Sequence, residues 1–318
     1  MSLYLDPEVE ALFAMAAQHP VPTFRQMGVA EGRRFYEAQG AALGGPVVEM
    51  ADIRDLSAEG PAGSIPLRLY RPKGLTDASA PTLVYFHGGG WVIGSIASHD
   101  RVCRQIAHRA GCAVLSVEYR LAPEHPAPAG PVDAIAALLW IAEHAGEFGC
   151  DPRRLAVGGD SAGGALSAVV ALAARDAGLS LRGQVLIYPC TDVREASWSS
   201  PSRVLNATVP PLTQDAATFL IDEFLADRNL ADDWRVSPIA ASSFAGVAPA
   251  LVITGSRDIL LDDGLGYAAR LRDAEVPVIH RNFPGMVHGF IELAGVLSAT
   301  HTALDTIAFF LRERLSAA

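Results

Sequence analysis

Residues 159–164, Gly-Asp-Ser-Ala-Gly-Gly, place one serine between a predicted strand and a predicted helix. The apolar run at 155–158 precedes this stretch, and the alanine-rich run at 165–174 follows it. A sharp strand-to-helix turn exposes the hydroxyl of Ser161 at the carboxyl edge of a parallel sheet, and the flanking glycines let strand and helix approach closely. The start of the helix also directs N–H groups toward any oxyanion formed there. The pattern predicts a nucleophilic serine on a tight elbow.

A second motif, His-Gly-Gly-Gly at residues 87–90, follows another apolar run at 82–86. Either short motif is weak alone, but the two together are typical of the nucleophile elbow and oxyanion loop of lipases and esterases. An oxyanion hole needs N–H donors aimed at the developing negative charge. We expect Ala162 to supply one donor and Gly88 and Gly89 to supply the others. The histidine of the motif is expected to anchor the loop.

The serine needs a general base, and three histidines follow it in the sequence. In this arrangement the acid and the histidine come after the serine, at later strand ends. His301 falls inside the predicted last helix and His280 lies in the middle of a predicted strand, where packed imidazoles are expected. His288 lies in a glycine-punctuated loop at 284–290, from which its ring can reach the sheet edge. We therefore predict His288 as the base.

The base needs a carboxylate to fix its tautomer, and Asp258 occupies the required loop position. It follows the predicted strand at 250–254 through Gly-Ser-Arg. Asp262 and Asp263 come just after it and fit an N-cap and a first-turn acid of the next helix. Ser161, His288 and Asp258 form the predicted catalytic triad.

The bulk composition suits a large globular enzyme. A chain of 318 residues, half of them apolar, can bury about 75% of its unfolded surface. The formal net charge of -10 and the lack of a Lys/Arg run predict no nucleic-acid partner. No His/Asp/Glu cluster has zinc-ligand spacing, so no metal is expected.

The amino-terminal residues and the cysteines predict a cytoplasmic protein without a membrane partner. Residues 1–8 carry acid where a secretory signal needs base, and the apolar stretch at 11–17 is too short for a membrane span. The four cysteines are far apart and form no Cys-x-x-Cys pair, so we expect them to be small buried side chains in a reducing compartment: Cys103, Cys112, Cys150 and Cys190.

Strand-like and helix-like runs alternate from residue 47 onward, which requires parallel strands with right-handed crossovers. Two segments depart from this alternation. Residues 1–45 read as helical, and the gap from 190 to 248 holds a predicted helix at 213–224 but no convincing strand. We divide the chain into an amino-terminal part of a helical cap (1–45), a first core part (46–189), a cap insertion (190–248) and a second core part (249–318).

With these residues located, the chain resembles the bacterial hormone-sensitive-lipase-like esterases (family IV) of the α/β-hydrolase superfamily. Matching stretches lie at 87–91, 118–126, 159–164, 258–260 and 288–290. Only Ile259 departs, at a position where the family usually has proline. The resemblance implies an eight-stranded, mostly parallel sheet with helices on both faces and a helical cap. It also implies hydrolysis of short-acyl carboxylic esters without a metal or organic cofactor.

The resemblance carries over to individual residues as well. It supports the three oxyanion donors named above and implies that Trp91, beside the oxyanion loop, lines the substrate pocket. Arg120 and Glu124 match a loop motif of the family, and we expect them to fix that loop. Many relatives form homodimers through the eighth strand, here at 276–283, whose unpaired backbone groups are available at a sheet edge.

The leading hypothesis is therefore a serine carboxylesterase that acts on a small-molecule ester through a covalent acyl-enzyme. A first alternative keeps the triad but hydrolyses an amide, carbamate or formamide, because the triad alone does not choose the leaving group. A second alternative is a non-catalytic small-molecule receptor. Plant hormone receptors of this resemblance have lost the triad histidine, whereas His288 is present here.

Overall fold

The computed structural model describes residues 4–76 and 78–316 and is built on one eight-stranded sheet. The strand order is β1-β2-β4-β3-β5-β6-β7-β8. β2 pairs antiparallel with β1 and β4, and all other neighbours are parallel. The strands are β1 (Met50–Gly60), β2 (Gly63–Pro72), β3 (Ala80–Phe86), β4 (Ala113–Val117), β5 (Cys150–Asp160), β6 (Gly183–Ile187), β7 (Ala250–Gly255) and β8 (Val278–Phe283). The mostly parallel sheet is confirmed.

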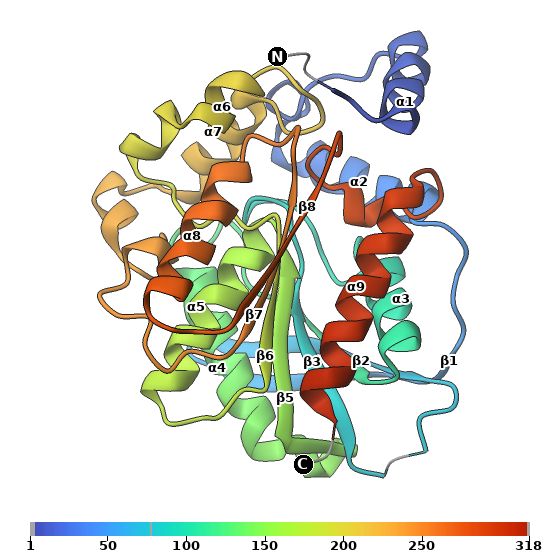
Figure 1. Cartoon of the computed structure of the whole chain (residues 1–318), viewed down its shortest axis with the longest axis vertical. Coiled ribbons are helices and arrows are strands. Elements are labelled where there is room, and N and C mark those ends of the chain that lie inside the picture. Colours follow the sequence, from blue (N-terminus) through green and yellow to red (C-terminus); the bar gives the residue numbers. More distant parts are fainter. Residues whose placement is uncertain (1–3, 77, 317–318) are drawn as a thin grey trace.

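Continuous apolar runs form the central strands because helices cover both faces of the sheet. β4, β6 and β7 are buried along their whole length, as parallel strands between two helical layers must be. One face carries α3 (Asp100–Ala110) and α9 (Ser298–Leu315). The other face carries α4 (Ala129–His144), α5 (Ala162–Asp176) and α8 (Leu261–Asp273), as Figure 1 shows.

Helices from two distant segments lie together at one end of the sheet (Figure 1). The amino-terminal segment supplies α1 (Pro7–Gln18) and α2 (Phe24–Leu43), and the segment between β6 and β7 supplies α6 (Pro201–Leu205) and α7 (Gln214–Phe224). Arg25 of α2 pairs with Asp215 of α7 at 3.0 Å. The predicted helix at 213–224 is confirmed, and no strand lies among the described residues from 190 to 248. The remaining short segments are 3-10 turns: η1 (Ala145–Phe148), η2 (Glu195–Ser199), η3 (Arg228–Asp232), η4 (Pro238–Ala240) and η5 (Phe290–Glu292).

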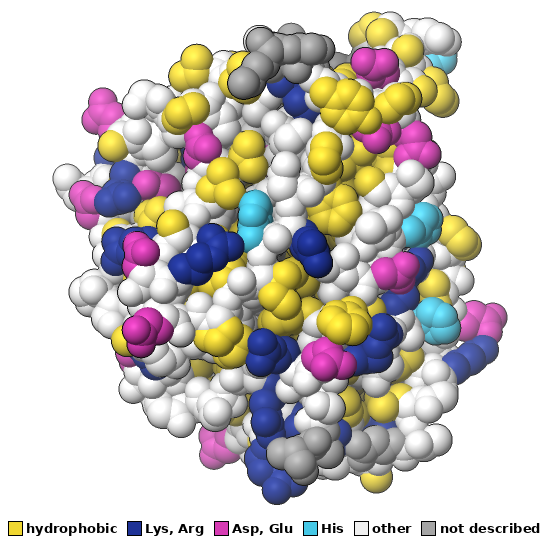
Figure 2. Space-filling view, in the orientation of Figure 1, with side chains coloured by type: hydrophobic (Ala, Val, Ile, Leu, Met, Phe, Trp, Pro, Cys, Tyr) yellow, Lys and Arg dark blue, Asp and Glu magenta, His cyan; other side chains and the backbone are white. Residues whose placement is uncertain are grey.

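The outer surface leaves some apolar side chains exposed on the amino-terminal cap segment. Figure 2 shows hydrophobic side chains gathered over α1, with charges of both signs spread over the rest of that face. Tyr4, Met15 and Val21 are among the exposed ones. No helix in the ranges 4–76 and 78–316 is long and apolar enough to cross a membrane.

β8 is an edge strand, and its only described strand neighbour is β7. Its side chains are partly or fully exposed, including Ile279 and Arg281. Pairing of two chains along this edge stays a prediction. The boundaries at residues 45, 189 and 248 likewise stay our interpretation of the chain.

Gly163 lets the elbow helix α5 approach the end of β3, and its replacement tests this contact. A Cβ at this position would lie 1.9 Å from the carbonyl oxygen of Phe86 and 2.6 Å from that of His87. We expect Gly163→Ala to lower the free energy of unfolding by about 1–3 kcal/mol or more, because backbone atoms must move. Urea unfolding measures the change. Gly146→Ala is the control, because a Cβ there meets nothing within 4 Å. Equal stability of the two variants would contradict the predicted clash.

Candidate active site

Ser161 lies on the elbow between β5 and α5 in a strained backbone conformation, with φ 55 and ψ -119. Positive φ is unfavourable for a residue with a Cβ and persists where neighbouring structure enforces it. Here the Ser161 N–H donates to Ile187 of β6 at 2.8 Å, and its carbonyl accepts from Cys190 at 3.2 Å. The elbow is therefore clamped by the neighbouring strand and by the loop that follows it.

The structure brings the three predicted triad residues together. Nε2 of His288 lies 2.8 Å from Oγ of Ser161, and Nδ1 of His288 lies 2.7 Å from Oδ2 of Asp258. Asp258 comes from the loop after β7 and His288 from the loop after β8, so the ends of β5, β7 and β8 supply the set, with β6 between β5 and β7. The second oxygen of Asp258 accepts from the Leu260 N–H at 2.8 Å, which holds the carboxylate in place.

The other candidate histidines and acids lie in structural roles. His280 contacts Thr254 on the neighbouring strand at 2.9 Å, and His301 of α9 contacts Arg109 at 2.9 Å. Asp262 and Asp263 lie in the first turn of α8, as predicted. The N-cap of α8 is Leu260, so the prediction of an N-cap aspartate is wrong.

Burial and a neighbouring charge shift the pKa of His288 in opposite directions. Burial lowers it, because charging an imidazole away from water is unfavourable. The Asp258 carboxylate raises it through its charge and its hydrogen bond, and this effect wins, so the pKa of His288 lies above 6.5. The histidine is thereby a stronger base than an isolated imidazole.

The oxyanion loop presents Gly89 and Gly90, together with Ala162 of the elbow, to the cavity above Ser161. Within residues 4–76 and 78–316, the N–H groups of these three residues have no hydrogen-bond acceptor. The Gly88 N–H instead donates to Asp160 at 3.1 Å and lies 3.3 Å from Nε2 of His99. This contradicts the prediction that Gly88 is an oxyanion donor, because its N–H is directed into the protein.

Asp160 anchors the oxyanion loop from behind. Its Oδ1 also accepts from the Tyr85 hydroxyl at 2.7 Å and lies 3.1 Å from Nε2 of His99. Burial raises the pKa of Asp160, but the charge and hydrogen bond of His99 outweigh burial and hold it below its usual value. Burial likewise lowers the pKa of His99, yet Asp160 and Glu292 raise it to about 9. The pair is therefore a buried ion pair beneath the loop.

His87 has the anchoring role predicted for it. Its ring stacks on Tyr119 with 4.3 Å between centroids, and its Nδ1 lies 2.8 Å from the carbonyl oxygen of Gly88. Burial lowers the pKa of His87 to about 3, so the ring is neutral and holds the loop by hydrogen bonding.

Arg120 and Glu124 fix the loop after β4, as predicted. Arg120 forms a bidentate pair with Asp133 of α4 at 2.7 Å. Glu124 pairs with Arg33 of α2 at 2.7 Å, and Arg33 also donates to the carbonyl of Val92 at 2.9 Å. The cap helix is thus tied to both loops that border the site.

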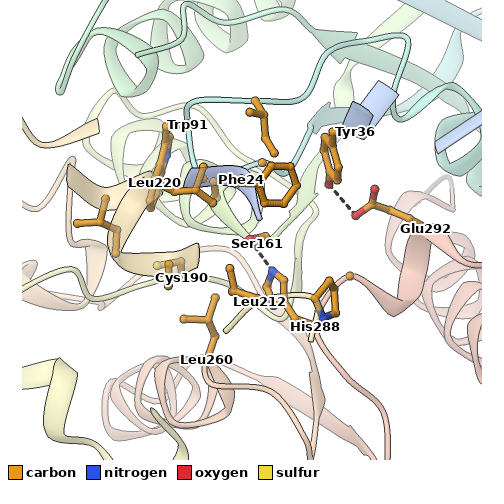
Figure 3. Close-up of a pocket in the computed structure, with 18 of the residues that line it drawn as sticks. Phe24, Tyr36, Trp91, Ser161, Cys190, Leu212, Leu220, Leu260, His288 and Glu292 are labelled. Carbon is orange, nitrogen blue, oxygen red and sulfur yellow. Dashed lines mark hydrogen bonds between the residues drawn. The ribbon is translucent and has the colours of Figure 1, made fainter. Parts of the chain in front are cut away.

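A cavity of about 120 Å³ lies over Ser161 and His288, enclosed by cap and core residues (Figure 3). Trp91 lines it, as the resemblance implies, and stacks on Phe224 of α7 with 4.3 Å between centroids. The apolar wall also contains Phe24, Leu212, Leu220, Ile221 and Leu260.

Several lining residues were not predicted from the sequence. Phe24 and Leu220 lie on predicted helices, but periodicity alone does not say which face meets a cavity. Cys190 was predicted only as a buried thiol, and it lines the cavity from the loop after β6, three residues beyond the strand end. Glu292 also lines the cavity. Its position four residues after His288 was the one feature of the sequence that could have indicated this.

One group of side chains among the described residues has the composition of a metal site. Ligand atoms of His99, Asp160 and Glu292 all lie within 4.8 Å of one another. However, the raised pKa of His99 keeps its ring protonated, and Oδ1 of Asp160 already receives bonds from Tyr85 and Gly88, although its buried Oδ2 has no partner among the described residues. A metal ligand must be an unprotonated imidazole. We therefore describe the group as a hydrogen-bonded network.

Comparison with known proteins agrees with this geometry. A family model described as an α/β-hydrolase fold matches residues 83–292. A carboxylic ester hydrolase of Mycobacterium tuberculosis is 43% identical over 86% of this chain and 73% of its own length. An ethyl acetate hydrolase of Pseudomonas putida is 37% identical over 90% of both chains.

Solved structures of esterases superpose on nearly the whole molecule. A thermostable esterase from Pseudomonas putida matches with a TM-score of 0.94 at 30% identity, covering 100% of both chains. A thermostable carboxylesterase from a metagenomic library matches with a TM-score of 0.87 at 37% identity, covering 91% of this chain and 98% of the other. The chain belongs to the bacterial hormone-sensitive-lipase-like family of the α/β-hydrolase superfamily and is a carboxylic ester hydrolase.

Proposed function

We propose that this enzyme hydrolyses short-acyl esters through a covalent acyl-enzyme on Ser161. The hydrogen-bonded chain from Asp258 through His288 to Oγ of Ser161 carries this proposal. It links a buried carboxylate to a hydroxyl at the base of a cavity, which is the arrangement that activates a serine.

In the first half of the reaction, Nε2 of His288 takes the proton of Ser161 as Oγ attacks the carbonyl carbon of the ester. The carbonyl oxygen becomes an oxyanion that accepts from the N–H groups of Gly89, Gly90 and Ala162. Removal of one such donor costs about 2.7–4 kcal/mol of barrier stabilisation in known cases. His288 then gives the proton to the departing alcohol oxygen as the ester C–O bond breaks.

In the second half, water attacks the acyl-serine and loses a proton to Nε2 of His288. The carboxylic acid then leaves as that proton returns to Ser161. Asp258 accepts the Nδ1–H of His288 throughout, which holds the ring in the required tautomer and stabilises the imidazolium.

The size of the cavity supports a short acyl group. The cavity over Ser161 has a volume of about 120 Å³, which suits a small substrate. Leu220 and Trp91 close the apolar side. The name of one relative, an ethyl acetate hydrolase, points to the same class of small ester.

Two features favour this proposal over the alternatives. The relatives reported above are named ester hydrolases, which favours an ester over an amide, carbamate or formamide. The bond between His288 and Ser161 favours catalysis over a receptor role, because a receptor has no need of an activated serine.

We also propose a cytoplasmic location, supported by the thiols. All four cysteines are buried and unpaired, as in proteins of a reducing compartment.

Replacement of Ser161 tests the proposed nucleophile. We expect Ser161→Ala to lower kcat for p-nitrophenyl butyrate by several orders of magnitude, because the covalent step is lost while the oxyanion donors remain. A fluorophosphonate should label the wild type and not this variant. Ser180→Ala, at an exposed position, is the control and should keep both properties. Near-normal turnover by Ser161→Ala would place the nucleophile elsewhere.

The pH dependence tests His288 as the base. His288 must be neutral to accept a proton, so activity should be lost as the pH falls through its pKa. Because Asp258 raises that pKa, kcat/KM should rise with pH around a midpoint above 6.5. Asp258→Asn should lower the midpoint and reduce kcat by about 10⁴-fold. Asp273→Asn, at an exposed position, should change neither. A rate that declines steadily between about pH 5 and 8 would exclude this role.

A series of p-nitrophenyl esters tests the acyl length. Each added methylene gains about 0.8 kcal/mol while it can be buried, so kcat/KM should rise and then fall once the cavity is full. We expect the maximum at roughly four to six carbons. Leu220→Ala should move it by about two carbons toward longer chains. Leu139→Ala, on the exposed face of α4, should not move it. A maximum at lipid-like chains, with rates that jump at an oil–water interface, would indicate a true lipase.

A further inference from the structure

One side of the cavity is polar, and the proposed hydrolysis uses none of its groups. Tyr36 and Gln39 line it from α2, three residues apart and therefore on one face of that helix. Glu292 lines it from η5. The Tyr36 hydroxyl donates to Oε1 of Glu292 at 2.8 Å. The cap helix thus holds a carboxylate at the cavity wall.

The second oxygen of Glu292, Oε2, has no hydrogen-bond donor among the described residues. Its nearest cationic partner is Nε2 of His99 at 4.0 Å, which is beyond hydrogen-bond length. No described residue donates to this Oε2, and the atom is not fully enclosed by protein. The side chain is 11% exposed. A carboxylate oxygen in this position can accept a hydrogen bond from a substrate.

The polar side is the side of the alcohol group. His288 delivers its proton to the departing alcohol oxygen, so that part of the substrate lies next to His288. Glu292 follows His288 by four residues and lines the same cavity. Figure 3 shows Glu292 and Tyr36 on one side of the pair formed by Ser161 and His288, and Trp91 on the other. The acyl chain therefore lies against the apolar wall and the alcohol group near Glu292.

We propose that Glu292 selects esters whose alcohol group carries a second hydroxyl, that is, monoesters of short diols and triols. The second hydroxyl donates to Oε2 of Glu292 while the acyl chain occupies the apolar side. This inference rests on the proposed function, because it assigns the alcohol to the side of His288. The amide of Gln39, at the exposed rim, offers a further partner to the same hydroxyl.

The environment of Glu292 disfavours alcohol groups that are apolar or charged. An apolar alcohol would bury the carboxylate without a donor, which is unfavourable. An anionic alcohol group would be repelled by Glu292. A cationic one would lie near the imidazolium that forms on His288 during the reaction. A neutral hydroxyl meets none of these penalties.

Three esters of one acid test the selection. 2-Hydroxyethyl butyrate and n-propyl butyrate have the same size and differ by a hydroxyl, and 2-methoxyethyl butyrate carries an oxygen without a donor. Released butyric acid is titrated to give kcat/KM. Measured above pH 7, where Glu292 is mainly ionised, the wild type should prefer the hydroxyethyl ester to the propyl ester by about tenfold, the lower range for one hydrogen bond to a charged acceptor. The methoxyethyl ester should show no such preference.

Variants of Glu292 assign the preference to this side chain. In Glu292→Leu the ratio of hydroxyethyl to propyl ester should fall below one, and Glu292→Gln, whose amide oxygen still accepts, should give an intermediate ratio. Glu313→Gln, at an exposed position of α9, is the matched control and should keep the wild-type ratio. A wild-type ratio near one, or an unchanged ratio in Glu292→Leu, would overturn the inference.

These measurements distinguish a failure of the Glu292 proposal from a failure of the esterase proposal. Ser161-dependent hydrolysis of p-nitrophenyl butyrate with a wild-type ratio near one overturns the role of Glu292 and leaves the esterase proposal standing. Failure to hydrolyse any of the four esters overturns the proposed function itself. If Glu292→Leu does not fold, the wild-type comparison of the hydroxyethyl and methoxyethyl esters still decides, because only the former donates. Equal rates for these two esters would overturn the inference.

Discussion

The carboxylate of Asp160 is the contact on which the active site depends. A buried charge is unfavourable unless it is paired and hydrogen-bonded, and Asp160 is held by Tyr85 of β3, by the Gly88 N–H and by His99. These partners come from the strand, the oxyanion loop and the segment before α3. Because Asp160 directly precedes Ser161, the same carboxylate fixes the distance between the nucleophile and the oxyanion loop. Removal of His99 would leave the Asp160 charge unpaired in the core, and loss of Tyr85 or of the Gly88 contact would remove a hydrogen bond from it.

The triad could be predicted from the sequence because each member stands at the end of a strand. Order along the chain and glycine-rich turns identify such positions, and the geometry of a parallel sheet then brings them together. The orientation of an individual N–H could not be predicted in this way. Gly88 was assigned to the oxyanion, but its N–H is directed at Asp160, 72 residues away in the sequence. The Gly88 N–H has this orientation because it donates to a buried carboxylate. A local sequence pattern does not indicate such a long-range contact.

The cap helices also have orientations that could not be predicted from the sequence. Helices were predicted in both cap segments, yet the faces that meet the cavity depend on how two distant segments pack. α2 is interrupted at Gly28, where φ is 69, so residues before and after this point do not share one continuous helical face. Phe24 precedes the interruption and Tyr36 follows it, and both reach the cavity. Hydrophobic periodicity assumes an unbroken helix and cannot place both residues.

The buried carboxylate of Glu292, on the polar side of the cavity, lowers the stability of the fold locally. Burial raises the pKa of Glu292 to about 7, which measures how poorly this carboxylate is solvated. Apolar residues line the opposite wall, and an apolar residue in place of Glu292 would remove the desolvation penalty. The Tyr36 hydrogen bond offsets only part of it, because one carboxylate oxygen keeps no donor among the described residues. Sequences otherwise consistent with their fold break a local rule mainly where function requires it. An under-satisfied carboxylate on the wall of the cavity that also contains Ser161 and His288 is such a departure, and the proposed diol selection gives it a function.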